Sequence, residues 1–150
     1  MTKNTTIINL TKENDTAIIP KRADENSAGA DLYANIKESI VINPGETKPI
    51  SAGISVALPE GTFGAIFARS GLACKNGLRL ANSVGVIDSS YRGQLIVALH
   101  NDSDAPKTID PNERIAQLVV IPYVSVNFKE VNKLDETERG EGGFGHSGKF

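Results

Sequence analysis

The chain has 150 residues, of which 39% are hydrophobic and 23% are charged, and its formal net charge at neutral pH is -2. We expect one domain over residues 1–150, because this length is enough to bury a substantial core. The charge argues against a broad basic face for nucleic acid, and no membrane-spanning run or secretory leader is seen, so neither nucleic-acid nor membrane partners are expected.

Short β-branched runs separated by Gly, Pro, Asn and Asp predict an all-β domain, a jelly-roll-like barrel or sandwich. The predicted strands are, in chain order, Thr6–Leu10, Ala30–Tyr33, Ile40–Ile42, Lys48–Ile50, Ile54–Ala57, Gly64–Phe67, Gln94–Leu99, Lys107–Ile109, Ile115–Ile121 and Val124–Lys129. Turns are expected at Asn43-Pro44-Gly45 and Pro59-Glu60-Gly61. One short helix is predicted from Ser70 to about Lys75, with Ser70 as its N-cap.

The first candidate functional group in chain order is Asp31, at the start of a predicted strand. It can assist a metal, bind an arginine from elsewhere or cap the strand, and the sequence alone favours the capping role. Arg69-Ser70-Gly71 comes shortly after the predicted strand Gly64–Phe67, at the start of the predicted helix. A guanidinium, a hydroxyl and free backbone N–H groups suit phosphate oxygens. An ordinary surface arginine beside a capping serine explains these residues equally well.

The segment Asn82–Gly93 places one carboxylate, Asp88, after the apolar pair Val86-Ile87 and directly before turn residues. A strand-forming pair is an unfavourable neighbour for a charge, and Asn82 and Tyr91 flank the aspartate with hydrogen-bonding and aromatic groups. This arrangement is typical of a hairpin that holds a ligand against a general base.

Other reactive side chains are scattered. Cys74 is the only cysteine, which permits no internal disulfide and indicates a reducing, cytoplasmic location; as a side chain it is more readily a small filler than a nucleophile. His100 is expected at a strand end, and His146 lies in the tail, so the histidines predict no zinc site. On the apolar strand after Glu113, Arg114 and Gln117 either line a ligand or bond to backbone.

The C-terminal segment from Glu138 to Gly148 holds five of the chain's fourteen glycines. Such tails are usually flexible and without function. Here, however, a single Arg139 and a single Phe144 stand among the glycines, a composition that suits a tail folding over an anionic, aromatic ligand.

Five segments together resemble, in order and content, the motifs of the trimeric dUTPase family. They are Ala28–Ala34, Ala68–Ala73, Asn82–Gln94, Arg114–Val119 and Arg139–Gly148, and the last is most similar to the bacterial branch. The resemblance implies a homotrimer of jelly-roll-like subunits with three sites at the subunit interfaces. One subunit is expected to give the phosphate motifs, a second the uracil hairpin and a third the tail, with residues 138–150 as a mobile lid.

The resemblance also implies the reaction: Mg²⁺-dependent hydrolysis of dUTP to dUMP and pyrophosphate. This reaction limits uracil incorporation into DNA and supplies dUMP for thymidylate synthesis. Asp88 matches the general base that deprotonates the water attacking the α-phosphorus, and as an ordinary aspartate it is ionised at neutral pH. Asn82 and the backbone of Val86 and Ile87 match the uracil contacts, which leave no room for a thymine methyl. Tyr91 matches the ring that packs on deoxyribose.

Further side chains are assigned through the same resemblance. Ile96 lines the nucleoside pocket, Phe144, with Gly145 beside it, stacks on the base, and Arg139 meets the terminal phosphates. The phosphate cradle is matched by Arg69, Ser70, Gly71 and Gln117. Mg²⁺ is expected on the substrate phosphates and water rather than on a protein ligand cluster, with Asp31 at most touching its waters.

Three positions depart from the family pattern. Ser90, Gln94 and Ala68 stand where aspartate, glutamate and proline are frequent, and none is a proposed catalytic group. One alternative function is dCTP deamination, but those enzymes use a glutamate shortly after the hairpin, where this chain has only apolar residues, Leu95–Leu99. The other is a non-catalytic binding protein, against which stand the retained Asp88 and Arg139.

Overall fold

The computed structural model describes residues 6–143 and confirms the predominantly β fold with one short helix. Its elements, in chain order, are β1 (Asn9–Lys12), β2 (Lys21–Arg22), β3 (Ala30–Tyr33), β4 (Ile40–Ile42), β5 (Thr47–Ser51), β6 (Ile54–Ala57), β7 (Thr62–Ala68), the helix η1 (Gly71–Lys75), β8 (Leu78–Leu80), β9 (Gly85–Asp88), β10 (Ile96–Asn101), β11 (Lys107–Ile109) and β12 (Arg114–Pro122). Among these residues, no helix is long and apolar enough to cross a membrane.

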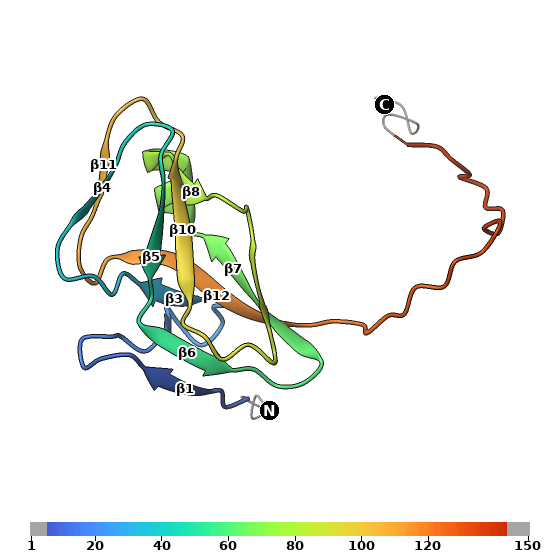
Figure 1. Ribbon diagram of the computed structural model, residues 1–150, viewed down its shortest axis with the longest axis horizontal. Coiled ribbons are helices and arrows are strands. Elements are labelled where there is room, and N and C mark those ends of the chain that lie inside the picture. The colour runs from blue at the N-terminus through green and yellow to red at the C-terminus, as the bar shows by residue number, and fades with distance from the viewer. Residues whose placement is uncertain (1–5, 144–150) are drawn as a thin grey trace.

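The largest sheet has five strands in the order β2-β3-β12-β7-β9, with all its paired strands antiparallel. A three-stranded sheet, β5-β10-β8, and the pairs β1-β6 and β4-β11 complete the body (Figure 1). The long strand β12 runs through the middle of the large sheet, between β3 and β7. Strands distant in the sequence are therefore neighbours, and residues from three parts of the chain meet at each end of β12.

The core is apolar and lies between these sheets. Its burial follows the strand period: on β10, Val97 and Leu99 are buried while Ile96 is exposed, as expected when one face of a strand meets the core. The largest fully buried side chains are Leu32, Ile42, Ile50, Ile54, Ile66, Leu78, Leu80, Leu95, Leu99, Ile109, Ile115 and Val97.

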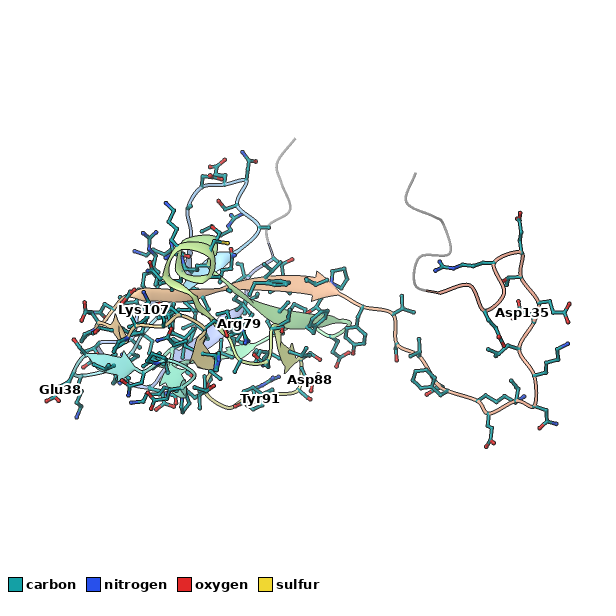
Figure 2. All side chains as sticks on the ribbon, turned by 90° about the horizontal axis from the view of Figure 1, so that it is seen from above. Glu38, Arg79, Asp88, Tyr91, Lys107 and Asp135 are labelled. Carbon is teal, nitrogen blue, oxygen red and sulfur yellow. The ribbon has the colours of Figure 1, made fainter. Side chains whose placement is uncertain are left out.

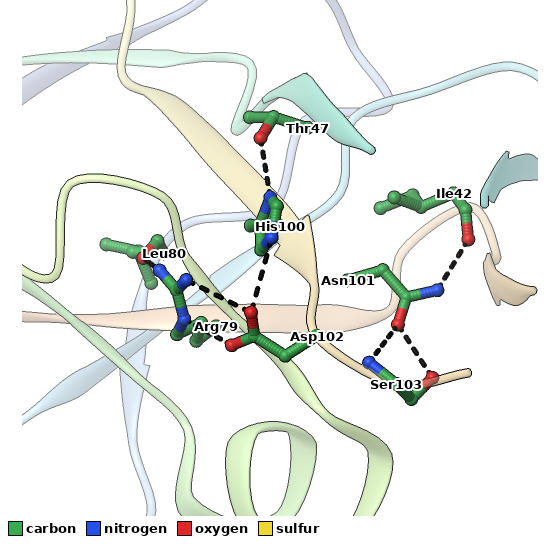
Figure 3. Close-up of polar contacts among 8 residues, drawn as sticks. All are labelled: Ile42, Thr47, Arg79, Leu80, His100, Asn101, Asp102 and Ser103. Carbon is green, nitrogen blue, oxygen red and sulfur yellow. Dashed lines mark hydrogen bonds and ion pairs between the residues drawn. The ribbon is translucent and has the colours of Figure 1, made fainter. Parts of the chain in front are cut away.

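Asn101 is the one buried polar side chain among the described residues, and all its contacts are internal. Its amide nitrogen donates to the carbonyls of Ile42 and Ala105, each at 2.9 Å, and its oxygen accepts from the backbone N–H and hydroxyl of Ser103 (Figure 3). A buried amide with all its partners costs little and specifies one arrangement. Asn101 therefore fixes the end of β10 against β4 and the following loop.

Most predicted strands are confirmed, several with the same bounds. Both predicted turns are confirmed by hydrogen bonds, from the Glu46 N–H to the Asn43 carbonyl at 2.9 Å and from the Thr62 N–H to the Pro59 carbonyl at 3.2 Å. The first strand is shifted to Asn9–Lys12, and β2, β8 and β9 were not predicted as strands.

The predicted strand Val124–Lys129 is wrong, because none of its residues is in a strand. After β12 the chain leaves the body as an extended arm (Figure 1). The alternating Val124, Val126 and Phe128 that suggested a strand are exposed by 83%, 61% and 97%. A strand needs a hydrogen-bonded neighbour, and within residues 6–143 no strand pairs with Val124–Lys129.

Candidate active site

A cavity of about 440 Å³ opens where β3, β7 and β12 meet the start of the helix. Its polar lining consists of side chains that the sequence singled out, namely Asp31, Arg69, Ser70, Arg114 and Gln117, together with Ser27. Gly71 lies in the same wall. The structure thus brings together the residues that were predicted to bind phosphate. Two guanidinium groups and one carboxylate give this cavity a formal charge of +1 at neutral pH. We call it the phosphate pocket.

Ser70 occupies the N-cap position of the helix, as the sequence predicted, but its side chain does not cap it. Its φ and ψ of -54° and -40° are already helical, and its side chain makes no cap hydrogen bond. A capping hydroxyl needs an extended backbone to reach the N–H groups of the first turn, so this conformation prevents capping. The helix itself is a single wide turn, Gly71–Lys75. The exposed Ser70 hydroxyl is therefore not used for capping the helix and is accessible to a ligand.

Asp31 does not cap its strand but pairs with arginines. Its Oδ1 lies 3.1 Å from Nε of Arg69, and its Oδ2 lies 3.3 Å from Nη1 of Arg114. Its carboxylate is 17% exposed, whereas the Arg69 and Arg114 side chains are 29% and 52% exposed. The arginine-binding alternative from the sequence is thus the one observed.

Gln117 is held so that its amide faces the pocket. Its Nε2 donates to the carbonyl of Ala68 at 3.1 Å, across the β12–β7 pairing. Beside Gly29, the amide oxygen of Gln117 packs so closely that a side chain at position 29 would have to displace the end of the Gln117 side chain. Gln117 therefore combines both alternatives left open by the sequence, because it bonds to backbone and lines a cavity.

The predicted hairpin is built on β9, which is the edge strand beside β7. Asp88 ends this strand opposite Phe63, and its carbonyl accepts the Tyr91 N–H at 3.0 Å, which closes the turn. The Asp88 side chain is exposed, as are Asn82 and Val86. An exposed edge position explains how a charge is tolerated directly after Val86 and Ile87, since no burial is required.

Tyr91 is oriented by contacts within the turn. Its hydroxyl donates to the Gln94 carbonyl at 3.1 Å, and its ring covers Gly93 so closely that a Cβ there would lie 2.3 Å from the hydroxyl oxygen. The ring is nonetheless 44% exposed, and Ile96, the other predicted lining residue, is 53% exposed. Figure 2 labels Asp88 and Tyr91 along the same side of the body. The hairpin residues thus form an open surface, not an enclosed pocket.

Within one chain the hairpin and the phosphate pocket lie at opposite ends of β7. Asp88 pairs with Phe63 near the start of that strand, whereas Arg69 follows its last residue, Ala68. Six positions separate Phe63 from Arg69, which corresponds to about 20 Å at about 3.3 Å per residue. One chain therefore does not bring its own Asp88 and Arg69 to the same ligand group.

The C-terminal arm leaves the body at the hairpin end. The Tyr123 N–H donates to the Gly61 carbonyl at 3.0 Å, and its ring packs edge-on against Phe63 with ring centres 6.5 Å apart. Farther along, Nε of Arg139 donates to the Gly142 carbonyl at 2.9 Å, which holds a local turn away from the body. Phe144 and Gly145 lie outside the described residues.

The remaining candidates lie apart from both regions. Cys74 is exposed on the helix, so the expectation of a filler is wrong. His100 is near the end of β10, as predicted; its Nδ1 lies 2.8 Å from the Thr47 hydroxyl and its Nε2 3.2 Å from Asp102 (Figure 3). A hydrogen bond from Arg79, more than the nearby His100, holds the pKa of Asp102 below its ordinary value. No group of three or more potential metal ligands occurs among residues 6–143.

Comparison with known proteins places these features in one family. A family model described as dUTPase matches residues 15–148. The deoxyuridine 5'-triphosphate nucleotidohydrolase of Alcanivorax borkumensis is 44% identical over 140 residues, covering 93% of each chain. That of Actinobacillus pleuropneumoniae serotype 3 is 50% identical over 132 residues, covering 87% of each chain.

A solved structure shares the fold. The Staphylococcus bacteriophage 80alpha dUTPase with dUpNHpp superimposes with a TM-score of 0.87 at 30% sequence identity, covering 96% of this chain and 99% of the phage chain. The family match extends over all the segments that build the phosphate pocket and the hairpin. With bacterial relatives at about half identity over most of the length, the chain belongs to the dUTPase family.

Proposed function

We propose that this chain is a dUTP nucleotidohydrolase that releases pyrophosphate by water attack on the α-phosphorus. The observation that carries the proposal is the pairing of two surfaces: a cationic pocket suited to a polyphosphate and an exposed edge hairpin ending in a carboxylate. The bacterial relatives are named for this activity, and this chain matches 93% and 87% of their lengths, which supports the same substrate here.

The active form is a homotrimer with each site shared between subunits. The separation of about 20 Å between the ends of β7 supports this arrangement, because a base acting on the α-phosphorus and a cradle for the adjoining phosphates must be neighbours. Val86 on the hairpin and Ile96 at the start of β10 are exposed apolar side chains, which also favours burial of this surface by a second chain or a ligand. The exposed Val124, Val126 and Phe128 of the arm favour a partner chain as well, because burying their apolar surface against it would lower the free energy.

Uracil is read by the outer edge of β9. Within residues 6–143, β9 pairs with a strand on one side only, so its other edge offers backbone N–H and C=O groups near Val86 and Ile87. These groups match the alternating donor and acceptor edge of uracil and reject the amino group of cytosine, while Asn82 adds a side-chain amide. A closely fitted hairpin leaves no space for a thymine methyl, and Tyr91 packs on the sugar where a 2′-hydroxyl would stand.

Asp88 is the general base. At the end of an exposed edge strand its carboxylate can orient a water molecule and accept its proton as the oxygen approaches the α-phosphorus. The departing pyrophosphate leaves with the electron pair of the broken phosphoanhydride bond. Arg69, Ser70 and the backbone N–H of Gly71, from the phosphate pocket of another subunit, hold the phosphates, and Gln117 contributes its amide.

The donor set suits Mg²⁺ carried by the substrate. Among the described residues, Asp31 is the only carboxylate lining the phosphate pocket, and a lone carboxylate already paired with two arginines is not a protein cage for a metal. Mg²⁺ prefers phosphate oxygens and water under such conditions. When bound, the ion stabilises the negative charge that develops on the phosphates.

The C-terminal segment 138–150 acts as a lid. Arg139 meets the terminal phosphates, and Phe144 with Gly145 covers the base, from a subunit other than the two that give the hairpin and the pocket. The arm supports this role because it already leads the chain away from its own body (Figure 1). A cytoplasmic, reducing location accompanies the proposal, in keeping with the single, exposed thiol of Cys74.

Release of pyrophosphate by the purified protein from dUTP, dCTP, dTTP and UTP, with and without Mg²⁺, tests the proposal. We expect release from dUTP alone and dependence on Mg²⁺. Ammonia from dCTP would instead support deamination, which the apolar stretch Leu95–Leu99 after the hairpin disfavours. Binding of dUTP without release would support a non-catalytic protein.

A further inference from the structure

Three residues of the phosphate pocket form a closed ring of contacts. Arg69 Nε donates to Oδ1 of Asp31 at 3.1 Å, and the other oxygen of Asp31 accepts from Arg114 Nη1 at 3.3 Å. Arg69 Nη1 then donates to the main-chain carbonyl of Arg114 at 3.2 Å. Each member thus contacts both others, and Arg69 is held by two separate nitrogens.

The ring depends on a local irregularity of β12. This strand pairs with β3 so that Gln117 lies opposite Asp31 and Ala116 opposite Leu32, but Arg114 lies opposite Tyr33, which shifts the register between Arg114 and Ala116. Bulges of this kind turn side chains and carbonyls away from the regular pleat. Here the shift accompanies a placement in which both the carbonyl and the guanidinium of Arg114 reach the Asp31–Arg69 pair.

The contacts leave Arg69 prepared for an anion. A guanidinium carries five N–H donors in one plane, and fixing it through Nε and Nη1 orients the plane while Nη2 takes no part in these two contacts. Asp31 also offsets the repulsion between two guanidinium groups that share one pocket. Without the carboxylate, the pocket would gain positive charge but lose the group that holds both arginines in place.

We propose that Asp31 and Arg114 are positioning residues for Arg69, and that they act on the reaction through its orientation. The inference rests on the proposed function, in which Arg69 grips the phosphates of dUTP. It assigns Asp31 a role toward arginines, through both of its oxygens, in place of a role toward the waters of a metal.

Steady-state hydrolysis of dUTP by Asp31→Asn, Arg114→Gln and Arg114→Lys tests this proposal. We expect Asp31→Asn and Arg114→Gln to lower kcat between about tenfold and about a hundredfold, because a displaced phosphate-binding group loses transition-state contacts. Arg114→Lys keeps the positive charge but lacks the planar guanidinium, and its kcat should fall less than that of Arg114→Gln. KM should not rise in Asp31→Asn, since that variant makes the pocket more positive toward a polyanion.

A double substitution separates positioning from an independent role. In an Arg69→Gln background, adding Asp31→Asn should change kcat by no more than about twofold, because the group that Asp31 positions is already gone. If the fold-losses in kcat of the two single variants instead multiplied in the double variant, the proposal would be overturned. A change in Mg²⁺ dependence found only in Asp31→Asn would also overturn it. Unchanged kcat in all three single variants would overturn it as well.

The pair Arg79–Asp102 supplies a matched control, because it is a second Arg–Asp ion pair, with side chains 42% and 45% exposed, outside the phosphate pocket. Arg79→Gln and Asp102→Asn should leave kcat unchanged. Thermal unfolding of every variant shows whether it is folded at the assay temperature; Arg114→Lys keeps the test possible if the others are not. Failure of the wild-type chain to hydrolyse dUTP would refute the proposed function, whereas normal hydrolysis by the variants refutes only this inference.

Discussion

The distance along β7 makes a quantitative prediction about mixed trimers. Take two variants of the full chain, Asp88→Asn and Arg69→Gln, each expected to be nearly inactive alone. In one chain these side chains lie at opposite ends of β7, six positions apart in register, which is about 20 Å and far beyond the ~3 Å of a hydrogen bond. A functional site must therefore take the base from one subunit and the arginine from another.

Random assembly of the two variants at equal amounts fixes the expected recovery. Half of the chains offer an intact hairpin and half an intact phosphate pocket, so about a quarter of the sites in symmetric trimers combine both. We expect co-refolded mixtures to regain about a quarter of the wild-type rate of pyrophosphate release.

The assay compares the mixture with each variant refolded alone, with two affinity tags confirming that mixed trimers have formed. Isolated mixed trimers that remain as inactive as the separate variants would refute the reasoning, because they would mean that base and arginine come from the same chain. A trimer is itself part of the prediction, so sedimentation must show a mass of three chains.

Three further predictions concern single changes. Asp88→Asn should bind dUTP with unchanged affinity but lose about 10²- to 10⁴-fold in kcat, because an amide accepts no proton, and near-normal turnover would exclude the base role. Truncation before Arg139 should lower kcat and leave the trimer intact in sedimentation, since a glycine-rich tail adds little to a packed core; dissociation into monomers would make the tail structural. Arg79 lowers the folded-state pKa of Asp102, so their interaction stabilises above the unfolded pKa and is lost as the pH falls through the folded one. Arg79→Gln should therefore lower Tm more at neutral pH than in acid below the folded-state pKa of Asp102, and an equal loss in both conditions would contradict the ion-pair explanation.

Local sequence signals were sufficient for most of the fold. Runs such as Ala30–Tyr33 and Ile54–Ala57 have β-branched or apolar residues bounded by turn formers, and these strands have the predicted bounds. The strand Leu78–Leu80 is as short as the predicted strand Ile40–Ile42, but it contains no β-branched residue, so its strand signal in the sequence is weak. The strand at Val124–Lys129 failed for the opposite reason: its alternation is clear, but a strand exists only with a neighbour, and sequence periodicity does not reveal one.

The site shows the same division between local and non-local information. The phosphate residues around Arg69 and the hairpin around Asp88 were identified from their own segments and from their resemblance to the family. The local pattern left arginine binding by Asp31 as one of three alternatives and did not identify the two arginines, since those contacts depend on the register of β3, β12 and β7. The Ser70 cap failed because side-chain type does not determine whether the backbone before a one-turn helix is extended or already helical.

Hydrolysis of dUTP in water enriched in heavy oxygen is the most direct measurement of the proposed chemistry. If the water positioned by Asp88 attacks the α-phosphorus, the heavy oxygen must appear in dUMP and the pyrophosphate must remain unlabelled. Label in the pyrophosphate would mean attack on the β-phosphorus and would contradict the assigned geometry. No release from dUTP at all, with a folded trimer and Mg²⁺ present, would contradict the function itself.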